Sequence, residues 1–130
     1  MRLNILVTLN AAYIPPLKVM LRSLFDNCPD NINIYLIHSD IPEEGIHQIS
    51  SFVSRHGHNL YPLVIDKELV SKAPVISYYS KEMYYRLFAH AVLPENVDKV
   101  LYLDPDILVI NPIDQLYNTD IGDYYFAAAE

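Results

Sequence analysis

Short apolar runs alternate with segments of helical period along this chain, and that alternation constrains the fold more than any other feature. Strand-like apolar runs occupy residues 3–9, 32–39, 60–66 and 100–103. Apolar positions at helical spacing lie between them, over residues 15–25, 42–56 and 80–91. Such alternation is typical of a parallel sheet with helices on both faces, and its ligands bind at the carboxyl ends of the strands. We therefore expect an α/β fold.

Charge and glycine content exclude several classes of protein. Nine Lys and Arg against sixteen Asp and Glu give a formal net charge of −7, and the basic residues are scattered. Nucleic acid attracts clustered cations, so we expect no nucleic-acid partner. The three glycines, Gly45, Gly57 and Gly122, form neither a G-x-G-x-x-G motif nor a P-loop. One cysteine, Cys28, excludes an internal disulfide and any cysteine-rich metal site.

Length and apolar patterning favour one soluble domain. The chain has 130 residues, about the size of a single domain. Its apolar runs are far shorter than the roughly 20 residues that span a bilayer, and no signal-peptide core opens the sequence. We expect a cytoplasmic protein without a transmembrane segment.

The last part of the sequence suggests that the domain continues. Residues 107–110 are expected to be extended, and Leu116 and Tyr117 a short turn of helix. Residues 124–129 have the pattern of a further strand, and the sequence stops inside it. An uncovered strand edge pairs readily with another chain. We expect residues 1–130 to be a single domain, the first part of something larger, which self-associates through this exposed edge.

The tripeptide Asp104-Pro105-Asp106 directly follows the fourth strand-like run. In an extended chain, two carboxylates at positions i and i+2 point to the same side, roughly 7 Å apart at their Cα atoms. Such a pair can bind one divalent cation, and Mn²⁺ or Mg²⁺ suits oxygen ligands. Asp and Pro are also common in turns, so a turn without a metal is the alternative.

Two further segments carry groups that suit a nucleotide. Asn10 and Tyr13 come after the first run, where an amide could bond a base edge and a ring could stack on it; an ordinary polar turn is the alternative. Arg86 is the single Lys or Arg of the aromatic helical segment 82–88 and could hold a phosphate, or could pair with Glu82 one turn earlier. The chain has eleven tyrosines, which suit either a carbohydrate surface or a core.

Together these segments resemble glycosyltransferase family 8, its bacterial members especially. The matching stretches are residues 4–13, 84–87, 98–109 and 120–123. The string Lys-Val-Leu-Tyr-Leu-Asp-x-Asp within 98–109 is the most specific of them. The likeness extends over all 130 residues, and it implies that residues 1–130 are a single donor-binding domain, the N-terminal half of a larger catalytic domain.

The resemblance implies a Rossmann-like GT-A fold and a retaining enzyme that uses a UDP-sugar, UDP-glucose or UDP-galactose, together with Mn²⁺ or Mg²⁺. It implies that Asp104 and Asp106 bind the metal and, with Pro105, lie at the UDP-sugar. The remaining residues that it implies are Thr8, Asn10 and Tyr13 against the uridine, Arg86 at the donor phosphate and sugar, and Tyr78 and Tyr79 in the loop that faces donor sugar and acceptor.

The same resemblance implies a saccharide or glycolipid acceptor, as in lipopolysaccharide or other cell-surface glycan synthesis, and a place in the cytoplasm at the inner face of the membrane. Asn10 stands where better-studied relatives have an aspartate, and the family's third metal ligand, a histidine, is expected beyond residue 130. Two alternatives remain open. One is a non-catalytic nucleotide-binding fragment. The other is a Mg²⁺-dependent haloacid dehalogenase-like phosphatase, whose Asp-x-Asp motif comes after the first strand.

Overall fold

The computed structural model describes residues 2–66, 68 and 85–128. In chain order its elements are β1 (Arg2–Thr8), η1 (Ala11–Tyr13), α1 (Ile14–Asn27), β2 (Asn31–His38), α2 (Glu43–Arg55), β3 (Asn59–Val64), η2 (Arg86–Phe88), α5 (Ala89–Val92), β4 (Leu101–Tyr102) and α6 (Asp114–Tyr117). Among the helices in these ranges, none is long and apolar enough to cross a bilayer.

The four strands form one parallel sheet in the order β3-β2-β1-β4. The chain first builds outward from β1 to β2 and β3, and then returns to add β4 on the other side of β1. The register aligns Leu6 with Tyr102 across β1 and β4. The prediction of a parallel α/β sheet is confirmed.

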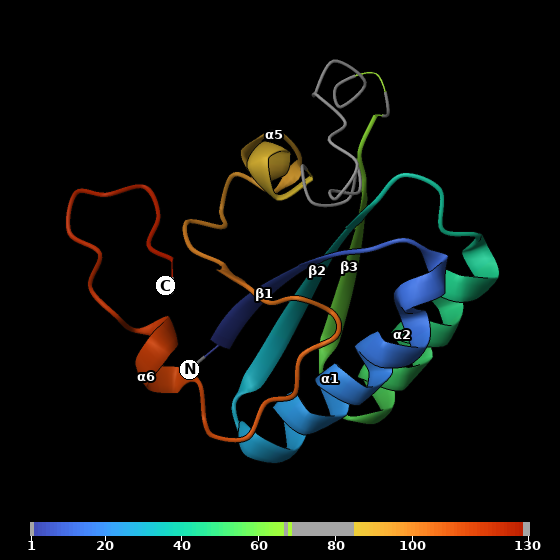
Figure 1. Ribbon diagram of the computed structural model, residues 1–130, viewed down its shortest axis with the longest axis horizontal. Coiled ribbons are helices and arrows are strands. Elements are labelled where there is room, and N and C mark those ends of the chain that lie inside the picture. The colour runs from blue at the N-terminus through green and yellow to red at the C-terminus, as the bar shows by residue number, and fades with distance from the viewer. Residues whose placement is uncertain (1, 67, 69–84, 129–130) are drawn as a thin grey trace.

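Both faces of the sheet are covered, as the apolar runs predict. Figure 1 shows α1 and α2 on one side of the sheet and α5 on the other. Ile5 and Val7 of β1 pack into the core beneath α1 and α2, whereas Leu6 points to the opposite face and packs with Tyr85 and Ala89. A strand buried on both faces needs apolar residues at successive positions, and β1 has them at Ile5, Leu6 and Val7.

The helix ends obey local chemistry. Pro15 and Pro16 lie in the first turn of α1. Backbone N–H groups there have no intrahelical acceptor, so proline loses no hydrogen bond by lacking one. Glu43 and Glu44 lie in the first turn of α2, where the helix dipole favours acids. Gly57 comes after α2 with φ of 82°, a left-handed conformation that glycine adopts without a steric cost.

The structure corrects the prediction of a strand at 124–129. Residues 124–128 form no strand, and Tyr124, Tyr125 and Phe126 are largely exposed to solvent. Strand propensity is expressed only against a neighbouring strand, and no strand of the described sheet lies beside this segment. The expectation of self-association, which was argued from that edge, stays a prediction.

Two smaller differences concern the fourth run and residues 107–110. The strand β4 is shorter than the expected 100–103, and residues 107–110 join no strand. The backbone of Val109 is instead bonded to α1: its N–H donates to Ser23 Oγ at 2.9 Å, and its carbonyl accepts from Asn27 Nδ2 at 3.0 Å. The expected turn of helix at Leu116 and Tyr117 is confirmed by α6. Of the helix expected over 80–91, residues 80–84 lie outside the described ranges.

Candidate functional site

The strand order creates one topological switch point, between β1 and β4. The chain runs from β1 to β2 and β3 on one side and then crosses back to β4 on the other side, and α/β proteins bind ligands at the carboxyl ends of the strands beside such a point. Tyr102 of β4 is paired with Leu6 of β1, and the Leu103 N–H donates to the Leu6 carbonyl at 3.1 Å. The segments that follow β1 and β4 therefore begin side by side at this edge of the sheet. The Ser39-Asp40 segment lies at the end of β2, on the other side of β1.

A tyrosine connects the two strands at this point. Tyr102 Oη lies 3.3 Å from Thr8 Oγ1, and either hydroxyl can donate. Burial raises the pKa of the Tyr102 phenol; the Thr8 hydrogen bond opposes the rise and the adjacent Asp104 carboxylate, by charge and hydrogen bonding, adds to it. The phenol therefore keeps its proton at neutral pH. Sequence reasoning treated Tyr102 as an ordinary strand residue, because an aromatic in a buried run looks like core.

Arg86 lies over the ring of the same tyrosine. Its guanidinium carbon is 5.3 Å from the Tyr102 ring centroid, within the range of a cation–π contact. The Arg86 side chain is exposed, so its planar N–H donors remain accessible to a ligand. The alternative pairing with Glu82 lies outside the described residues.

Asn10 and Tyr13 form the turn between β1 and α1. Asn10 Oδ1 accepts from the Ala12 N–H at 2.9 Å and caps η1, which ends at Tyr13. The Tyr13 ring is 44% exposed, available for stacking. Asparagine is a preferred cap residue, and Asn10 supplies the side-chain acceptor that sets this turn.

The two carboxylates come directly after β4. Asp104 and Asp106 are exposed on either side of a buried Pro105, and Pro105 and Asp106 form a turn rather than the extended geometry that the spacing suggested. Within the described ranges, no Lys or Arg is paired with either carboxylate. This all-oxygen donor set fits Mn²⁺ or Mg²⁺. No cluster of three His, Cys, Asp or Glu side chains able to hold a metal occurs among the described residues, so the pair is an incomplete ligand set.

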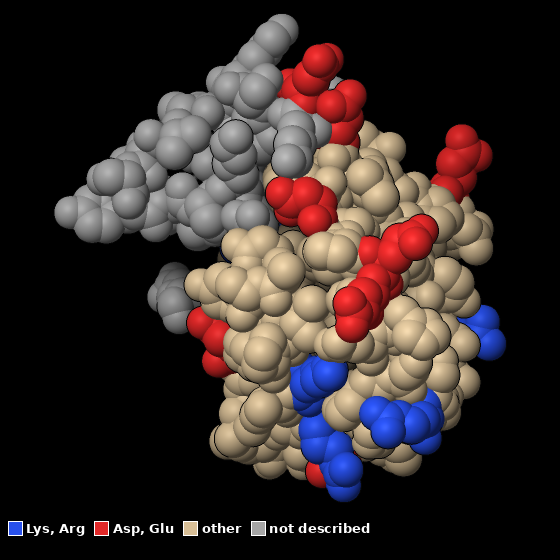
Figure 2. All heavy atoms as spheres, turned by 90° about the vertical axis from the view of Figure 1, so that its right-hand side faces the viewer, with Lys and Arg blue, Asp and Glu red and all other residues tan. Residues whose placement is uncertain are grey.

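A concavity of the described surface lies apart from these residues, at the ends of β2 and β3 beside α2. Asp40, Glu43 and Glu44 line it together with His38 and His47. Acidic side chains gather on the upper part of this face, as Figure 2 shows. Three carboxylates would repel a diphosphate. The switch point, with hydroxyls, an exposed ring and a cation, is the better candidate. Tyr78 and Tyr79, expected to face the donor sugar, lie outside the described residues.

Comparison with known proteins gives a family. The model of the family described as glycosyl transferase family 8 matches residues 4–130. Glycosyltransferase GlyE of Streptococcus pneumoniae is 34% identical over 124 residues, which cover 91% of this chain and 29% of GlyE. The lipopolysaccharide 1,2-glucosyltransferase of Escherichia coli is 28% identical, over 92% of this chain and 36% of that enzyme.

A solved glycosyltransferase structure also resembles this chain. A crystal structure of the galactosyltransferase LgtC in complex with donor and acceptor sugar analogs superposes with a TM-score of 0.82 at 28% identity. The match covers 93% of this chain and 44% of LgtC, which identifies the Rossmann-like GT-A fold. The chain therefore spans less than half the length of these relatives.

Proposed function

Because the chain belongs to glycosyl transferase family 8, we propose that it forms the donor-binding part of a glycosyltransferase and holds a UDP-sugar at the switch point between β1 and β4. One observation carries this proposal. Thr8, Arg86 and Asp104 come from three separate segments and meet around Tyr102, at the edge of the sheet where α/β proteins bind nucleotides.

The described residues suggest how each part of such a donor would be held. The exposed Tyr13 ring, at the end of the turn that Asn10 caps, offers a flat surface for uracil. The guanidinium of Arg86 offers paired donors for a phosphate or sugar oxygen. Thr8 offers a hydroxyl at the end of β1, beside the Tyr102 hydroxyl.

Asp104 and Asp106 would hold the divalent metal, with Pro105 fixing the turn between them. When bound, such a metal acts as a Lewis acid that stabilises the charge developing on the departing diphosphate, a contribution of several kcal/mol. A chain with a net charge of −7 gains from a metal in a second way, because two carboxylates alone would repel the diphosphate.

The finer parts of the proposal rest on the family and the named relatives. The reaction retains anomeric configuration and takes UDP-glucose or UDP-galactose as donor. The acceptor is a saccharide or glycolipid of the cell surface, in line with a relative named as a lipopolysaccharide 1,2-glucosyltransferase. The enzyme works in the cytoplasm at the inner face of the membrane. Residues 1–130 are one nucleotide-sugar-binding domain of a larger catalytic unit, consistent with the 44% of LgtC that the chain covers.

Metal-dependent UDP binding tests the proposal. Calorimetric titration of UDP with Mn²⁺ present should show binding that excess chelator removes. Asp106→Ala should abolish the Mn²⁺-dependent binding and leave the circular dichroism spectrum unchanged, because the side chain is exposed. Asp98→Ala is the matched control: it removes an exposed carboxylate just before β4 and should bind UDP as the parent does.

Three results distinguish the alternatives. UDP binding without any sugar transfer or UDP-sugar hydrolysis would favour a non-catalytic nucleotide-binding module. Hydrolysis of phosphate esters with Mg²⁺ would favour the phosphatase, although its motif comes after the first strand and Asp104 here comes after β4, the fourth. Equal UDP binding by Asp106→Ala in excess chelator would refute metal-dependent donor binding at this site.

A further inference from the structure

We propose that Tyr102 is a positioning residue of the donor site, one whose hydroxyl sets Thr8 and Asp104 and whose ring face sets Arg86. The inference rests on the proposed function and deepens it, because it names the group that assembles the donor contacts before the donor arrives. A site whose groups are held in place before binding loses less side-chain entropy when the ligand binds.

The first argument is geometric. Side chains alternate along a strand, so Tyr102 and Asp104 emerge on the same side of the sheet, as do Leu6 and Thr8 of β1. The Leu6 and Tyr102 side chains pack in the same cluster beneath α5. The Tyr102 ring thus lies on a packed base, and its hydroxyl is carried outward to Thr8 at 3.3 Å. Arg86 approaches the exposed ring face at 5.3 Å.

The second argument concerns the partners of the hydroxyl. A tyrosine that serves packing alone needs only its ring. Here the hydroxyl lies against two side chains, Thr8 and Asp104, and both are groups assigned to the donor site. The partners of Tyr117 are different: its hydroxyl accepts from the Asn4 N–H and donates to the Lys99 carbonyl, both at 3.3 Å. Backbone partners indicate a structural role for Tyr117, whereas the side-chain partners Thr8 and Asp104 indicate that Tyr102 positions groups of the donor site.

Tyr117 is also a close chemical match. A cation lies over its ring as well, with Lys99 Nζ 4.4 Å from the centroid. Tyr117 lies beside the amino-terminal half of β1, at Asn4, whereas Tyr102 lies beside its carboxyl end, at Thr8. Deleting one hydroxyl from each therefore makes the same chemical change at opposite ends of one strand.

The test is UDP affinity with Mn²⁺ in the parent chain, Tyr102→Phe, Tyr102→Leu and Tyr117→Phe. Tyr102→Phe keeps the ring and loses the hydroxyl, and should weaken UDP roughly two- to tenfold, as expected for one hydrogen bond. Tyr102→Leu also loses the surface under Arg86 and should weaken it further. Tyr117→Phe should bind UDP as the parent does while lowering the unfolding midpoint.

A double-mutant cycle separates positioning from direct contact. Thr8→Val deletes the same hydrogen bond from the other side and keeps the shape of the side chain. If Tyr102 acts through Thr8, the variant that carries both Tyr102→Phe and Thr8→Val should lose less UDP affinity than the product of the two single-variant fold losses. Without ligand, the Arg86 Nε–H resonance should move in Tyr102→Leu, which removes the ring, and stay near its parent position in Tyr102→Phe. Thr8→Val also supplies the comparison if Tyr102→Phe folds poorly.

The outcomes are distinct. If the parent binds no UDP with Mn²⁺, the proposed function fails and this inference fails with it. If the parent binds UDP and Tyr102→Phe binds it equally well, the inference alone is overturned. An equal loss in Tyr117→Phe would also overturn it, because the loss would then result from removing any buried phenol. Loss confined to Tyr102, with a non-additive cycle, supports it.

Discussion

The two ends of β1 use the same kinds of groups for different purposes. At the amino-terminal half, Asn4 donates its backbone N–H to Tyr117 and its side-chain carbonyl accepts from Asn33 Nδ2 at 3.0 Å. At the carboxyl end, Thr8 shares a hydrogen bond with Tyr102, and Asp104 lies beside them. Both ends have a tyrosine with a cation over its ring.

The difference lies in where the polar groups find partners. Asn4, Asn33 and Asn59 are aligned across three strands and bond side chain to side chain, with Asn59 Nδ2 donating to Asn33 Oδ1 at 3.1 Å. Asn4 Nδ2 also donates to the Lys99 carbonyl at 3.3 Å, so the amides of this row have their partners within the protein. Near the carboxyl end of β1, the side chains of Arg86, Asp104 and Asp106 are exposed to solvent. Polar groups that satisfy each other hold a fold together, whereas polar groups directed outward can bind a ligand.

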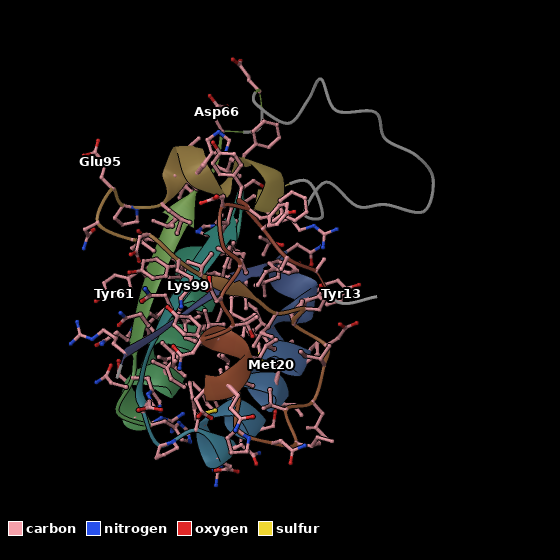
Figure 3. All side chains as sticks on the ribbon, turned by 90° about the vertical axis from the view of Figure 1, so that its left-hand side faces the viewer. Tyr13, Met20, Tyr61, Asp66, Glu95 and Lys99 are labelled. Atoms are coloured by element: carbon pink, nitrogen blue, oxygen red, sulfur yellow. The ribbon has the colours of Figure 1, made fainter. Side chains whose placement is uncertain are left out.

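Replacing Tyr13, at the proposed donor site, and Tyr61, away from it on β3, gives the largest expected contrast. Tyr13 and Tyr61 are 44% and 42% exposed and lie on opposite sides of the molecule (Figure 3). Tyr13→Ala should weaken UDP by roughly 1–3 kcal/mol, the usual value of a base stacked on an aromatic ring. Tyr13→Phe should be nearly neutral, since the ring does the stacking. Tyr61→Ala should leave UDP binding unchanged in the same calorimetric titration.

A large loss of UDP affinity in Tyr13→Phe would indicate that the hydroxyl, not the ring, makes the contact. Equal losses in Tyr13→Ala and Tyr61→Ala would contradict the contrast between the two regions, because Tyr61 stacks only on Tyr35, with ring centroids 5.1 Å apart, among the described residues.

Breaking the asparagine row should affect stability alone. Asn33→Ala removes a buried amide and leaves Asn4 Oδ1 and Asn59 Nδ2 without this partner. We expect the free energy of unfolding to fall by about 1–2 kcal/mol, measured by urea denaturation. UDP affinity of the folded variant should equal that of the parent. A selective loss of UDP affinity with unchanged stability would reverse the roles assigned to the two ends.

The smallest expected effect is a dependence on pH. His58 Nδ1 accepts from the Ile32 N–H at 3.2 Å, at the start of β2, and its ring stacks on Phe25. Burial lowers the pKa of His58, and the neighbouring His56 lowers it further. The unfolded chain therefore takes up a proton first as pH falls. The stability linked to His58 is complete above about pH 6.5 and is lost as pH falls through the lower folded value.

His58→Gln keeps an acceptor near the Ile32 N–H but cannot titrate. Its unfolding free energy, measured between about pH 7.5 and 5.5, should fall less steeply than that of the parent. A residual slope is expected because burial also lowers the pKa of His38, whose Nδ1 accepts from the Ile41 N–H at 3.1 Å. An unchanged slope in His58→Gln would show that this histidine is not the titrating group.

Local sequence patterns predicted the fold well where each element carries its own signal. β1 and β2 are buried on both faces and carry apolar runs at residues 5–7 and 34–37. α1 and α2 have helical spacing with Pro or Glu in the first turn. Residues 124–128 also carry a strand pattern, yet they form none, since a strand needs a neighbour that the pattern does not reveal.

The candidate site was predictable as a set of residue types at strand ends, but not as an assembly. Asn10, Tyr13 and the two carboxylates were identified from their positions after apolar runs, and Thr8 from the family resemblance. The role of Tyr102 could not be, because its hydroxyl meets Thr8 across 94 residues of sequence. The bonds between Val109 and α1 are similar: they join residues 82 and 86 positions apart, and no local pattern indicates them.

Line broadening by Mn²⁺ tests most directly whether the metal and the donor bind at the β1–β4 switch point. In a ¹⁵N-labelled chain with UDP, a trace of Mn²⁺ should broaden amide resonances most at Thr8, Asp104 and Asp106. The effect should decline along β1 toward Asn4, roughly 13 Å further along the strand, and Asp106→Ala should abolish it. Strongest broadening at Asp40, Glu43 and Glu44, unaffected by Asp106→Ala, would place the metal in the acidic concavity and contradict the account.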